Sequence, residues 1–475
     1  MAVSISQDTN FTTSVKNLSQ QIFGKNPKKE SMLQLAVGYF HIANIQQLAA
    51  KEVSNKAESD VRSHTRSRVK NHANDLIRHD LYREQRYTQL DNLCRDILLL
   101  SEGDSFTEDN RKSARLLATI QLLSPNDISK VPASNELNKP LYKAVLCLRV
   151  LDKLCIDNSI SEPYIKERLA GIPPEKYARF SSIDPISYKG FVEEVKIPLI
   201  KAALLQDIGN NHPDAQLILK GKSGKEDPFR VLSVEDRKSL LQIDYRETIK
   251  YLVEGIGVAK YVGNLKVERD YFDVKEKQKL LFIKTLLKGS INPKKGIGNL
   301  LKVPQIYSSI VLSTKSNYNY ALLPKVYQAL YKNAEKGVCH HIVVDAMHAI
   351  TGTFPLGYGV TYIAENTQGD KQYCYEYAIV KGLYPDNPEA PLCRTTTRNL
   401  SFISFGQDIV VPKERNLHFT EVSKKLVTID KGRLNEILSL LSSNHTERSK
   451  DDLIPRYWLA NEYFTTKAHQ NLWNK

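Results

Sequence analysis

The longest helical pattern in the chain lies near its start, over residues 30–105. This stretch contains no proline, and its apolar residues recur at the spacing of an amphipathic helix. The positions that carry the spacing are Leu76, Leu90, Leu93, Ile97 and Leu98. Residues 50–85 are polar on nearly every side, and such a helix either bridges solvent or packs against another chain. We therefore expect a long helical N-terminal region with a polar central part.

Glycine, proline and polar turns divide the rest of the chain. The segment "SEGDSFTEDN" (101–110) interrupts the helical pattern, which favours a domain boundary near residue 110. From there to about residue 350, helical segments follow one another, separated by turns such as "GIPPEK", "NNHPDA" and "INPKKG". At "GTFPLGYGVTYIAE" the period becomes alternating, and short β-rich pieces lead to a last amphipathic helix, "KGRLNEILSLLSS".

The pattern therefore predicts a mainly α fold in three parts. Residues 1–110 form a helical N-terminal region, and residues 111–355 form an all-α domain. Residues 356–475 form a small β subdomain with a C-terminal helix and an aromatic tail.

Composition and charge narrow the class of protein. The 475 residues are 41% hydrophobic, which is ordinary for a globular chain of two to four domains. The formal net charge of +14 favours anionic binding partners, such as nucleic acid, nucleotides, lipid headgroups or an acidic protein. The charge is concentrated in residues 259–302, with 11 Lys and Arg against 4 Asp and Glu, and in residues 61–90, with 7 against 3.

Other features point to the cytoplasm. No window approaches the ~18 uninterrupted apolar residues that a membrane-spanning helix needs, and the polar start has no apolar core of a signal peptide. The six cysteines show no CxxC pair and no zinc-finger spacing, so we expect reduced thiols. We therefore expect a cytoplasmic protein without membrane insertion.

Four motifs, taken in their order along the chain, carry a resemblance to a known family. They are "AALLQDIGNNHPDAQLIL" (202–219), "LSVEDRKSLLQIDYRETIKYL", "ALLPKVYQALYKNAEKGVCHHIVVDAMHAITGTFPLGYGVTYI" and "EYAIVKGLYPDNPEAPLCR". The first resembles the "AALLHDIGK" segment of the HD-GYP family, and the last two look like that family's closing helices and terminal hairpin. This family belongs to the HD superfamily, and its members hydrolyse bacterial cyclic di-GMP. The likeness covers roughly residues 180–415 and implies that residues 111–355 are an HD-like domain.

The resemblance also implies a catalytic site, and this chain departs from it. Catalysis in the family uses two or three metal ions held by His and Asp, which activate a water molecule. Here Gln206 stands in place of the histidine of the HD pair, and Asn210 stands in place of the following lysine. The helix that should supply the next ligand reads "LQIDYRETIKYL" and offers Asp244 instead of an imidazole.

Asp207 is left without the other ligands that a metal needs. No histidine occurs between His79 and His212, or between His212 and His340, whereas a metal usually takes at least four ligands. We therefore expect a degenerate, metal-free site with no cofactor and no catalytic residue, formed by Gln206, Asp207, Asn210 and Asp244. We expect the Asp207 carboxylate to have a structural role, in which it hydrogen-bonds helix ends.

Two further sets of residues have the chemistry of a metal site. In "CHHIVVDAMH", His341, Asp345 and His348 share one face of a helix. The resemblance places this helix away from the cleft, so a structural cluster is the favoured interpretation. The pair His79-Asp80 lies in the polar N-terminal helix, without the preceding apolar run, and is typical of a solvated face.

The predicted function is that of a catalytically inactive, HD-GYP-like signalling protein, acting as a receptor or a protein-interaction scaffold. Cyclic di-GMP is a candidate ligand, because arginine stacking on purines and cation pairing with phosphates need no metal. Charge and nearness in sequence to the degenerate motifs select Lys201, Arg237, Lys294 and Lys295 as ligand contacts.

The N-terminal helical region is expected to bind a protein partner or a second copy of the chain. The residues assigned to this contact are Arg62, Arg66, Arg68, Arg78, Arg83 and Arg86. The alternative is a nucleic-acid-binding protein, but aromatic residues do not alternate with this arginine series and no binding module is recognisable. A third reading, a hydrolase with another site, is disfavoured by the missing histidines. The salt dependence of partner binding distinguishes the signalling protein from the nucleic-acid-binding protein, because binding to nucleic acid weakens steeply as the salt concentration rises.

Overall fold

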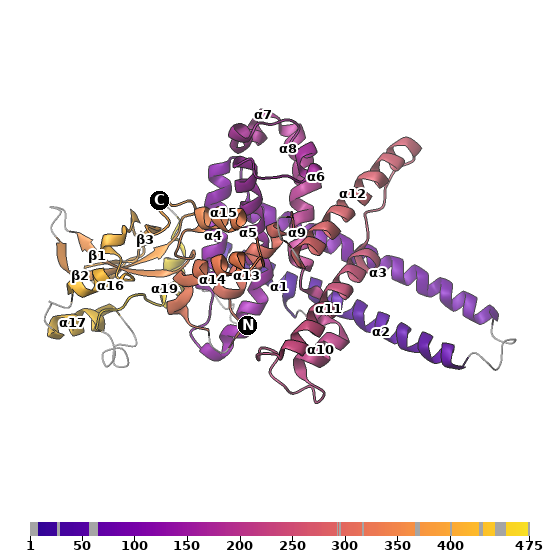
Figure 1. Cartoon of the computed structure of the whole chain (residues 1–475), viewed down its shortest axis with the longest axis horizontal. Coiled ribbons are helices and arrows are strands. Elements are labelled where there is room, and N and C mark those ends of the chain that lie inside the picture. Colours follow the sequence, from indigo (N-terminus) through magenta and orange to yellow (C-terminus); the bar gives the residue numbers. More distant parts are fainter. Residues whose placement is uncertain are drawn as a thin grey trace, which may run out of the picture.

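The computed structural model describes residues 8–25, 29–56, 65–291, 293, 296–315, 318–365, 371–399, 401–426, 431–441 and 453–473. Within helices and strands it gives only the backbone of residues 45–56, 65–81, 365 and 371–374. The described chain is mainly α-helical, with a small antiparallel sheet in its C-terminal part (Figure 1), which confirms the predicted fold class.

The N-terminal region begins with four helices. They are α1 (Asn10–Phe23), α2 (Met32–Lys56), α3 (Thr65–Ser101) and α4 (Phe106–Leu122). Hydroxyl caps set two of the starts, because Thr9 accepts a hydrogen bond from the amide of Thr12 and Ser105 accepts one from the amide of Glu108. Helices α2 and α3 run side by side and extend away from the body of the molecule (Figure 1). The helical stretch expected over 30–105 therefore contains two helices, α2 and α3, and α4 begins directly after it.

The middle of the chain is a continuous series of helices. These are α5 (Val131–Ile156), α6 (Pro163–Arg168), α7 (Phe180–Ile183), α8 (Pro185–Phe191), α9 (Ile197–Leu205), α10 (Pro213–Lys220), α11 (Val234–Lys250), α12 (Lys266–Ile291), α13 (Asn299–Val311), α14 (Val326–Glu335) and α15 (His341–Thr351). Shorter 3₁₀ turns are η1 (Ile128–Lys130), η2 (Pro174–Arg179), η4 (Ile208–Asn211) and η6 (Tyr320–Lys325), and π-helical segments are η3 (Val192–Lys196) and η5 (Tyr251–Ile256). This region matches the helical pattern of the sequence.

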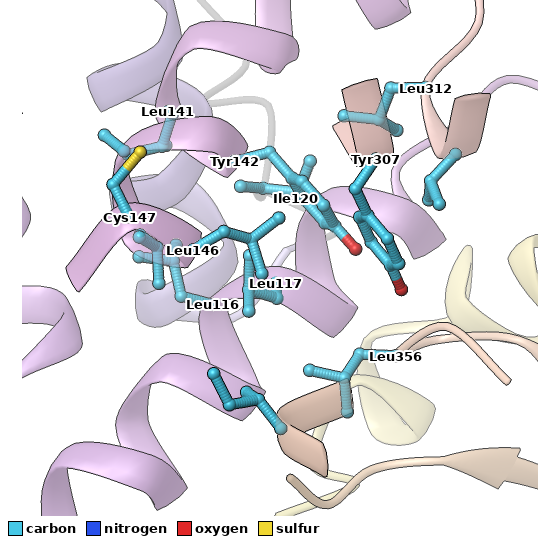
Figure 2. Packing of buried hydrophobic residues seen from close by; sticks show 14 of the residues in the cluster. Leu116, Leu117, Ile120, Leu141, Tyr142, Leu146, Cys147, Tyr307, Leu312 and Leu356 are labelled. Atoms are coloured by element: carbon cyan, nitrogen blue, oxygen red, sulfur yellow. The ribbon is translucent and has the colours of Figure 1, made fainter. Parts of the chain in front are cut away.

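The core is built around α5, whose residues from Leu141 to Leu151 are all buried. Figure 2 shows side chains of α4, α5 and α13 packed together, with Leu356 reaching them from the start of the β subdomain. The residues labelled there are Leu116, Leu117, Ile120, Leu141, Tyr142, Leu146, Cys147, Tyr307, Leu312 and Leu356. The buried residues form one hydrophobic cluster that runs from Val15 to Trp473. The boundaries expected near residues 110 and 355 therefore lie within a shared core.

The C-terminal part holds the sheet. Its elements are β1 (Gly359–Glu365), β2 (Lys371–Val380), β3 (Leu392–Thr395), β4 (Thr397–Arg398), β5 (Ser401–Phe402), β6 (Asp408–Val410), η7 (Lys413–Arg415), α16 (Thr420–Leu426), α17 (Lys431–Leu441), α19 (Ala460–Phe464) and η8 (Lys467–Gln470). The four-stranded sheet has the order β1-β2-β3-β6, all antiparallel, and β4 pairs with β5. Gly359 pairs with Ile379 and Tyr362 with Glu376.

Aromatic residues attach the C-terminal tail to this sheet and to the start of the chain. The indole of Trp458 stacks on Tyr377 with ring centroids 4.8 Å apart, and its Nε1 donates to the Ala378 carbonyl at 3.0 Å. Further on, the side chain of Gln470 accepts a hydrogen bond from the amide of Thr9 at 2.8 Å. The tail therefore joins the β subdomain to α1, although the two ends are far apart in sequence.

Candidate functional site

Asp207 lies at the end of a wholly buried helix. Every residue of α9 is buried, as expected of its apolar sequence, and the chain then turns through η4. At this turn Gly209 approaches α11 so closely that a Cβ atom on it would lie 2.1 Å from the carbonyl oxygen of Asp244. The amide of Gly209 donates to the hydroxyl of Thr248 at 3.0 Å. The glycine is therefore required by the contact between η4 and α11.

Both carboxylate oxygens of Asp207 have side-chain partners. The ammonium of Lys143, on α5, lies 2.7 Å from Oδ2, and Nε2 of Gln305, on α13, donates to Oδ1 at 2.8 Å. Partial burial raises the pKa of Asp207, but the charge and hydrogen bond of Lys143 outweigh it and hold that pKa below its usual value. The structural role that we expected is thus carried by two side chains rather than by helix ends.

Asp244 lies beside Asp207, and its pKa is shifted in the opposite direction. Its side chain is buried, and burial, followed by the negative charge of Asp207, raises the pKa of Asp244 well above its usual value. Among the described residues, its Oδ1 atom finds no hydrogen-bond partner. Burial and the charge of Asp207 therefore favour the protonated, neutral form of Asp244.

The other two degenerate positions are close in the chain but do not add ligands. Gln206 is buried, and within the described part of the chain its Oε1 accepts no hydrogen bond. Asn210 lies in η4, where its carbonyl accepts a hydrogen bond from the side chain of Gln216 at 2.8 Å. The structure therefore brings all four predicted positions to the junction of α9, η4 and α11.

The donor atoms present do not fit the metal ions that the resemblance implies. Across the described residues, no group of three or more His, Cys, Asp and Glu is arranged to hold a metal ion. The nearest histidine in sequence, His212, is buried and caps α10, with Nδ1 accepting from the amide of Asp214 at 3.2 Å. Burial lowers the pKa of His212, so it is a neutral cap.

A group of cations surrounds Asp207. Lys139 and Lys143, on α5, both act electrostatically on the Asp207 carboxylate. Lys302, one turn before Gln305 on α13, is half-buried and makes no hydrogen bond or ion pair with any described residue. Burial lowers the pKa of Lys302, Asp207 raises it, and the charges of Arg237 and Lys143 lower it further. We call Lys139, Lys143, Arg237 and Lys302 the cation cluster. Its acidic neighbours are Asp207, which is bound to Lys143, and Glu136, which lies 3.5 Å from Lys139.

Of the four predicted ligand contacts, the structure brings only Arg237 to this cluster. Lys201 pairs with Asp91 at 2.7 Å and lies over the ring of Tyr87, lining a separate cavity of about 260 Å³ between α3, α9 and α12. The acids and bases in that cavity are paired with one another, as in the contact between Arg95 and Glu193. Lys294 and Lys295 lie outside the described residues.

The predicted partner-binding arginines divide into two groups. Arg86 is buried and donates to the Gly255 carbonyl at 2.6 Å, and Arg83 donates to the Ile256 carbonyl at 3.4 Å. These carbonyls end η5, where a cation is favoured by the helix dipole. Arg83 and Arg86 therefore anchor α3 to the body of the molecule, which differs from the open surface that we expected. The side chains of Arg62, Arg66, Arg68 and Arg78 lie outside the described residues.

In the predicted cluster on α15, hydroxyl groups contact the side chains of Asp345 and His348. Tyr331 donates to Asp345 at 2.9 Å and lies 3.4 Å from Nδ1 of His348. The other ring nitrogen of His348 is 3.3 Å from the hydroxyl of Thr353, and Tyr327 stacks on the ring. These contacts hold α15 against α14 as a structural unit. The pair His79-Asp80 falls among the residues whose side chains are not described.

A buried ionic network, which the sequence pattern did not indicate, lies among these helices. Arg149 is fully buried and contacts Glu102 and Asp152, and Lys196 contacts the same two acids. The hydroxyl of Tyr177 donates to Asp152 at 2.7 Å. A charged residue inside the apolar run of α5 is the one signal that could have indicated it.

No family model, no curated protein and no solved structure matches this chain. Among the described helices, none has the length and apolar character needed to cross a membrane.

Proposed function

We propose that this chain is a non-catalytic receptor that binds a phosphate-bearing anion at the cation cluster, with cyclic di-GMP as the candidate ligand. The observation that carries the proposal is Lys302, a half-buried lysine without a hydrogen bond or ion pair in the described chain. Burying an ammonium group is costly unless an anion accompanies it. A ligand phosphate would supply the missing partner.

The balance of charge supports an anionic ligand. Four cations stand against the Asp207 carboxylate and against Glu136, which lies 3.5 Å from Lys139, while burial and the charge of Asp207 raise the pKa of Asp244 and favour its protonated form. Lys143 is already bound to Asp207, so Lys302 and Arg237 are the side chains that can turn to a ligand. Arginine is suited both to bidentate phosphate contacts and to stacking on a purine.

A non-catalytic role follows from the same residues. The ammonium of Lys143 holds one oxygen of Asp207 at 2.7 Å and the amide of Gln305 holds the other at 2.8 Å. The histidines that the HD-GYP resemblance implies are absent from the sequence around Gln206. Hydrolysis of a phosphodiester by the family's chemistry needs several such ligands. The chain therefore has residues that can hold a phosphate but lacks that ligand set.

Calorimetric titration of the full chain with cyclic di-GMP tests the proposal, with GMP and inorganic phosphate as comparison ligands. We expect Lys302→Gln to weaken cyclic di-GMP binding by about tenfold or more, since a charge-assisted contact is worth about 1.5–3 kcal/mol. Lys176→Gln, at an exposed and distant position on η2, is the control and should leave binding unchanged.

Three results would contradict the proposal. One is that none of the three ligands binds the full chain. Another is that the Lys302→Gln and Lys176→Gln variants bind cyclic di-GMP equally well. The third is turnover of cyclic di-GMP, which would identify an enzyme. Binding of mixed-sequence DNA with a steep salt dependence, without binding of cyclic di-GMP, would instead favour the nucleic-acid-binding alternative.

A further inference from the structure

Lys302 differs from the other lysines of the cation cluster in having no acid in contact with its amine. Lys143 is bound to Asp207 at 2.7 Å, and Lys139 lies 3.5 Å from Glu136. Lys302 is half-buried and makes no hydrogen bond or ion pair with any described residue. An amine that is held in an ion pair keeps its proton and is a poor nucleophile. Within the described chain, Lys302 is therefore the cluster lysine that is best placed to react.

The position of Lys302 on α13 leaves its amine to a bound ligand. Lys302 precedes Gln305 by three residues, so the two side chains lie on one face of the helix. Nε2 of Gln305 donates to Oδ1 of Asp207 at 2.8 Å, and Lys143 holds Oδ2. The carboxylate that acts electrostatically on Lys302 is thus already bound by two other side chains.

The neighbours of Lys302 favour its unprotonated form. Burial lowers the pKa of Lys302, and the charges of Asp207 and Cys339 raise it. The charges of Arg237 and Lys143 lower it again, and the net shift of this pKa is downward. An exposed lysine is about 0.1% unprotonated at about pH 7.5, and each unit by which its pKa falls raises that fraction tenfold. Lys302 therefore presents more nucleophilic amine than an exposed lysine does.

The same cluster selects the class of electrophile. Arg237 is suited to bidentate phosphate contacts, and it does not compete as a nucleophile because its guanidinium stays protonated. In an acyl phosphate, the reactive carbonyl carbon is joined directly to a phosphate oxygen. A phosphate held at the cluster therefore brings this carbon close to the Lys302 amine. Holding two reactants together in this way raises the rate of their reaction by orders of magnitude.

We propose that Lys302 is a site of direct acylation by acyl phosphates, and that its acylation weakens ligand binding at the cation cluster. In this step the Lys302 nitrogen attacks the carbonyl carbon, so that a C–N bond forms while the C–O bond to phosphate breaks. Inorganic phosphate leaves with the electron pair of that bond, and it takes up the proton that the nitrogen loses. The product is an uncharged amide, and the step needs no further reactant.

Acylation removes one of the two side chains that can turn to a ligand and leaves only Arg237. The acylated chain should therefore bind cyclic di-GMP about tenfold or more weakly than before, as expected for Lys302→Gln. This regulation rests on the proposed function, because it concerns the same anion site. The acylation step itself needs only a bound acyl phosphate.

Incubation of the full chain with acetyl phosphate at about pH 7.5, followed by peptide mass spectrometry, tests the acylation. We expect Lys302 to be acetylated about tenfold or more faster than Lys176, an exposed lysine on η2. Inorganic phosphate should slow the reaction at Lys302 and not at Lys176, because it competes for the cluster. With p-nitrophenyl acetate, an uncharged donor that lacks phosphate, the preference for Lys302 should be smaller.

Two neighbouring variants test the role of the cluster. Arg237→Gln should slow the acetylation of Lys302 by about tenfold, because it removes a phosphate contact and a charge that lowers the pKa of Lys302. Lys238→Gln removes a charge from the next residue of α11, which is also exposed, and should leave the rate at Lys302 unchanged. Equal rates at Lys302 and Lys176, or equal effects of the two variants, would overturn the acylation site.

Calorimetric titration of the acetylated chain with cyclic di-GMP tests the regulation. The unaltered chain should lose about tenfold or more in affinity after acetylation, whereas Lys302→Arg should keep its own untreated affinity, because its guanidinium is not acetylated. Selective acetylation of Lys302 without any loss of affinity would overturn the regulation. A chain that is acetylated selectively at Lys302 but never binds cyclic di-GMP would support the acylation site and overturn the proposed function.

Discussion

At the scale of single residues, the site is dominated by two neighbouring acids with opposite behaviour. Asp207 is partly exposed and held by Lys143, so its pKa is lowered despite the effect of burial. Asp244 is buried, and burial and the charge of Asp207 raise its pKa. The ionised form is therefore favoured for Asp207 and the protonated form for Asp244, although the two acids lie side by side where η4 meets α11. This difference gives the stability of the chain a specific pH dependence.

We expect Asp244→Asn to stabilise the protein at neutral and alkaline pH and to change little below about pH 4. Asp244 has a raised pKa in the folded state, so its contribution is fully present below the unfolded pKa and is lost as pH rises through the folded pKa. Asparagine resembles the protonated acid but cannot ionise, so the variant does not lose this contribution to stability as pH rises. The difference in unfolding free energy should grow by about 1.4 kcal/mol per pH unit from about pH 4 up to the folded-state pKa of Asp244, and should stay constant above it.

Urea denaturation at several pH values measures this difference. Asp386→Asn, at an exposed position in the β subdomain, is the matched control and should show no such trend. A pH-independent effect of Asp244→Asn would mean that Asp244 is ionised in the folded protein at neutral pH, in contrast to our assignment.

At the scale of elements, close contacts decide which residues the site contains. The turn η4 meets α11 through Gly209, and α3 is fixed to η5 by Arg83 and Arg86. Both contacts join segments that are far apart in sequence, and neither is visible in the periodicity of a single helix. The contact at Gly209 also holds Asp207 and Asp244 near each other.

Gly209→Ala should destabilise the protein by about 1–3 kcal/mol, because its Cβ atom would lie 2.1 Å from the Asp244 carbonyl oxygen and would force α11 to shift. Gly38→Ala, in the exposed face of α2 with nothing within 4 Å of the added atom, should instead stabilise by about 0.5–1 kcal/mol. Thermal and urea unfolding compare the two variants. Equal effects would show that η4 can move away from α11 at little cost.

At the scale of the whole molecule, the three expected regions share one core and one buried ionic network. The network joins Glu102 at the end of α3 to Arg149 in α5 and Lys196 in η3. Buried charges of this kind are costly to separate, so they link the N-terminal helices firmly to the central helices. We expect the chain to unfold without an early loss of its N-terminal helices α1 and α4.

Arg149→Met should lower the free energy of unfolding by about 3–5 kcal/mol, since Glu102 and Asp152 would remain buried with only Lys196 to balance them. Arg95→Met removes a surface contact with Glu193 and should cost about 1 kcal/mol or less. Urea denaturation of both variants gives the comparison. Similar losses would indicate that water reaches the network and screens it.

The sequence by itself determined the elements of this protein. The mainly α fold, the change to strands after residue 350 and the buried character of α9 all follow from hydrophobic spacing, which is a local property of the chain. The lack of histidines between His79 and His212, and between His212 and His340, is likewise a property of the sequence.

The tertiary structure decided which of those elements meet, because contacts between distant residues leave no trace in local spacing. Asp207 meets Lys143 across 64 positions and Gln305 across 98, so neither partner could be selected beforehand. For the same reason Lys201 was assigned to the ligand contacts although it pairs with Asp91 in another cavity, while Lys302 was missed.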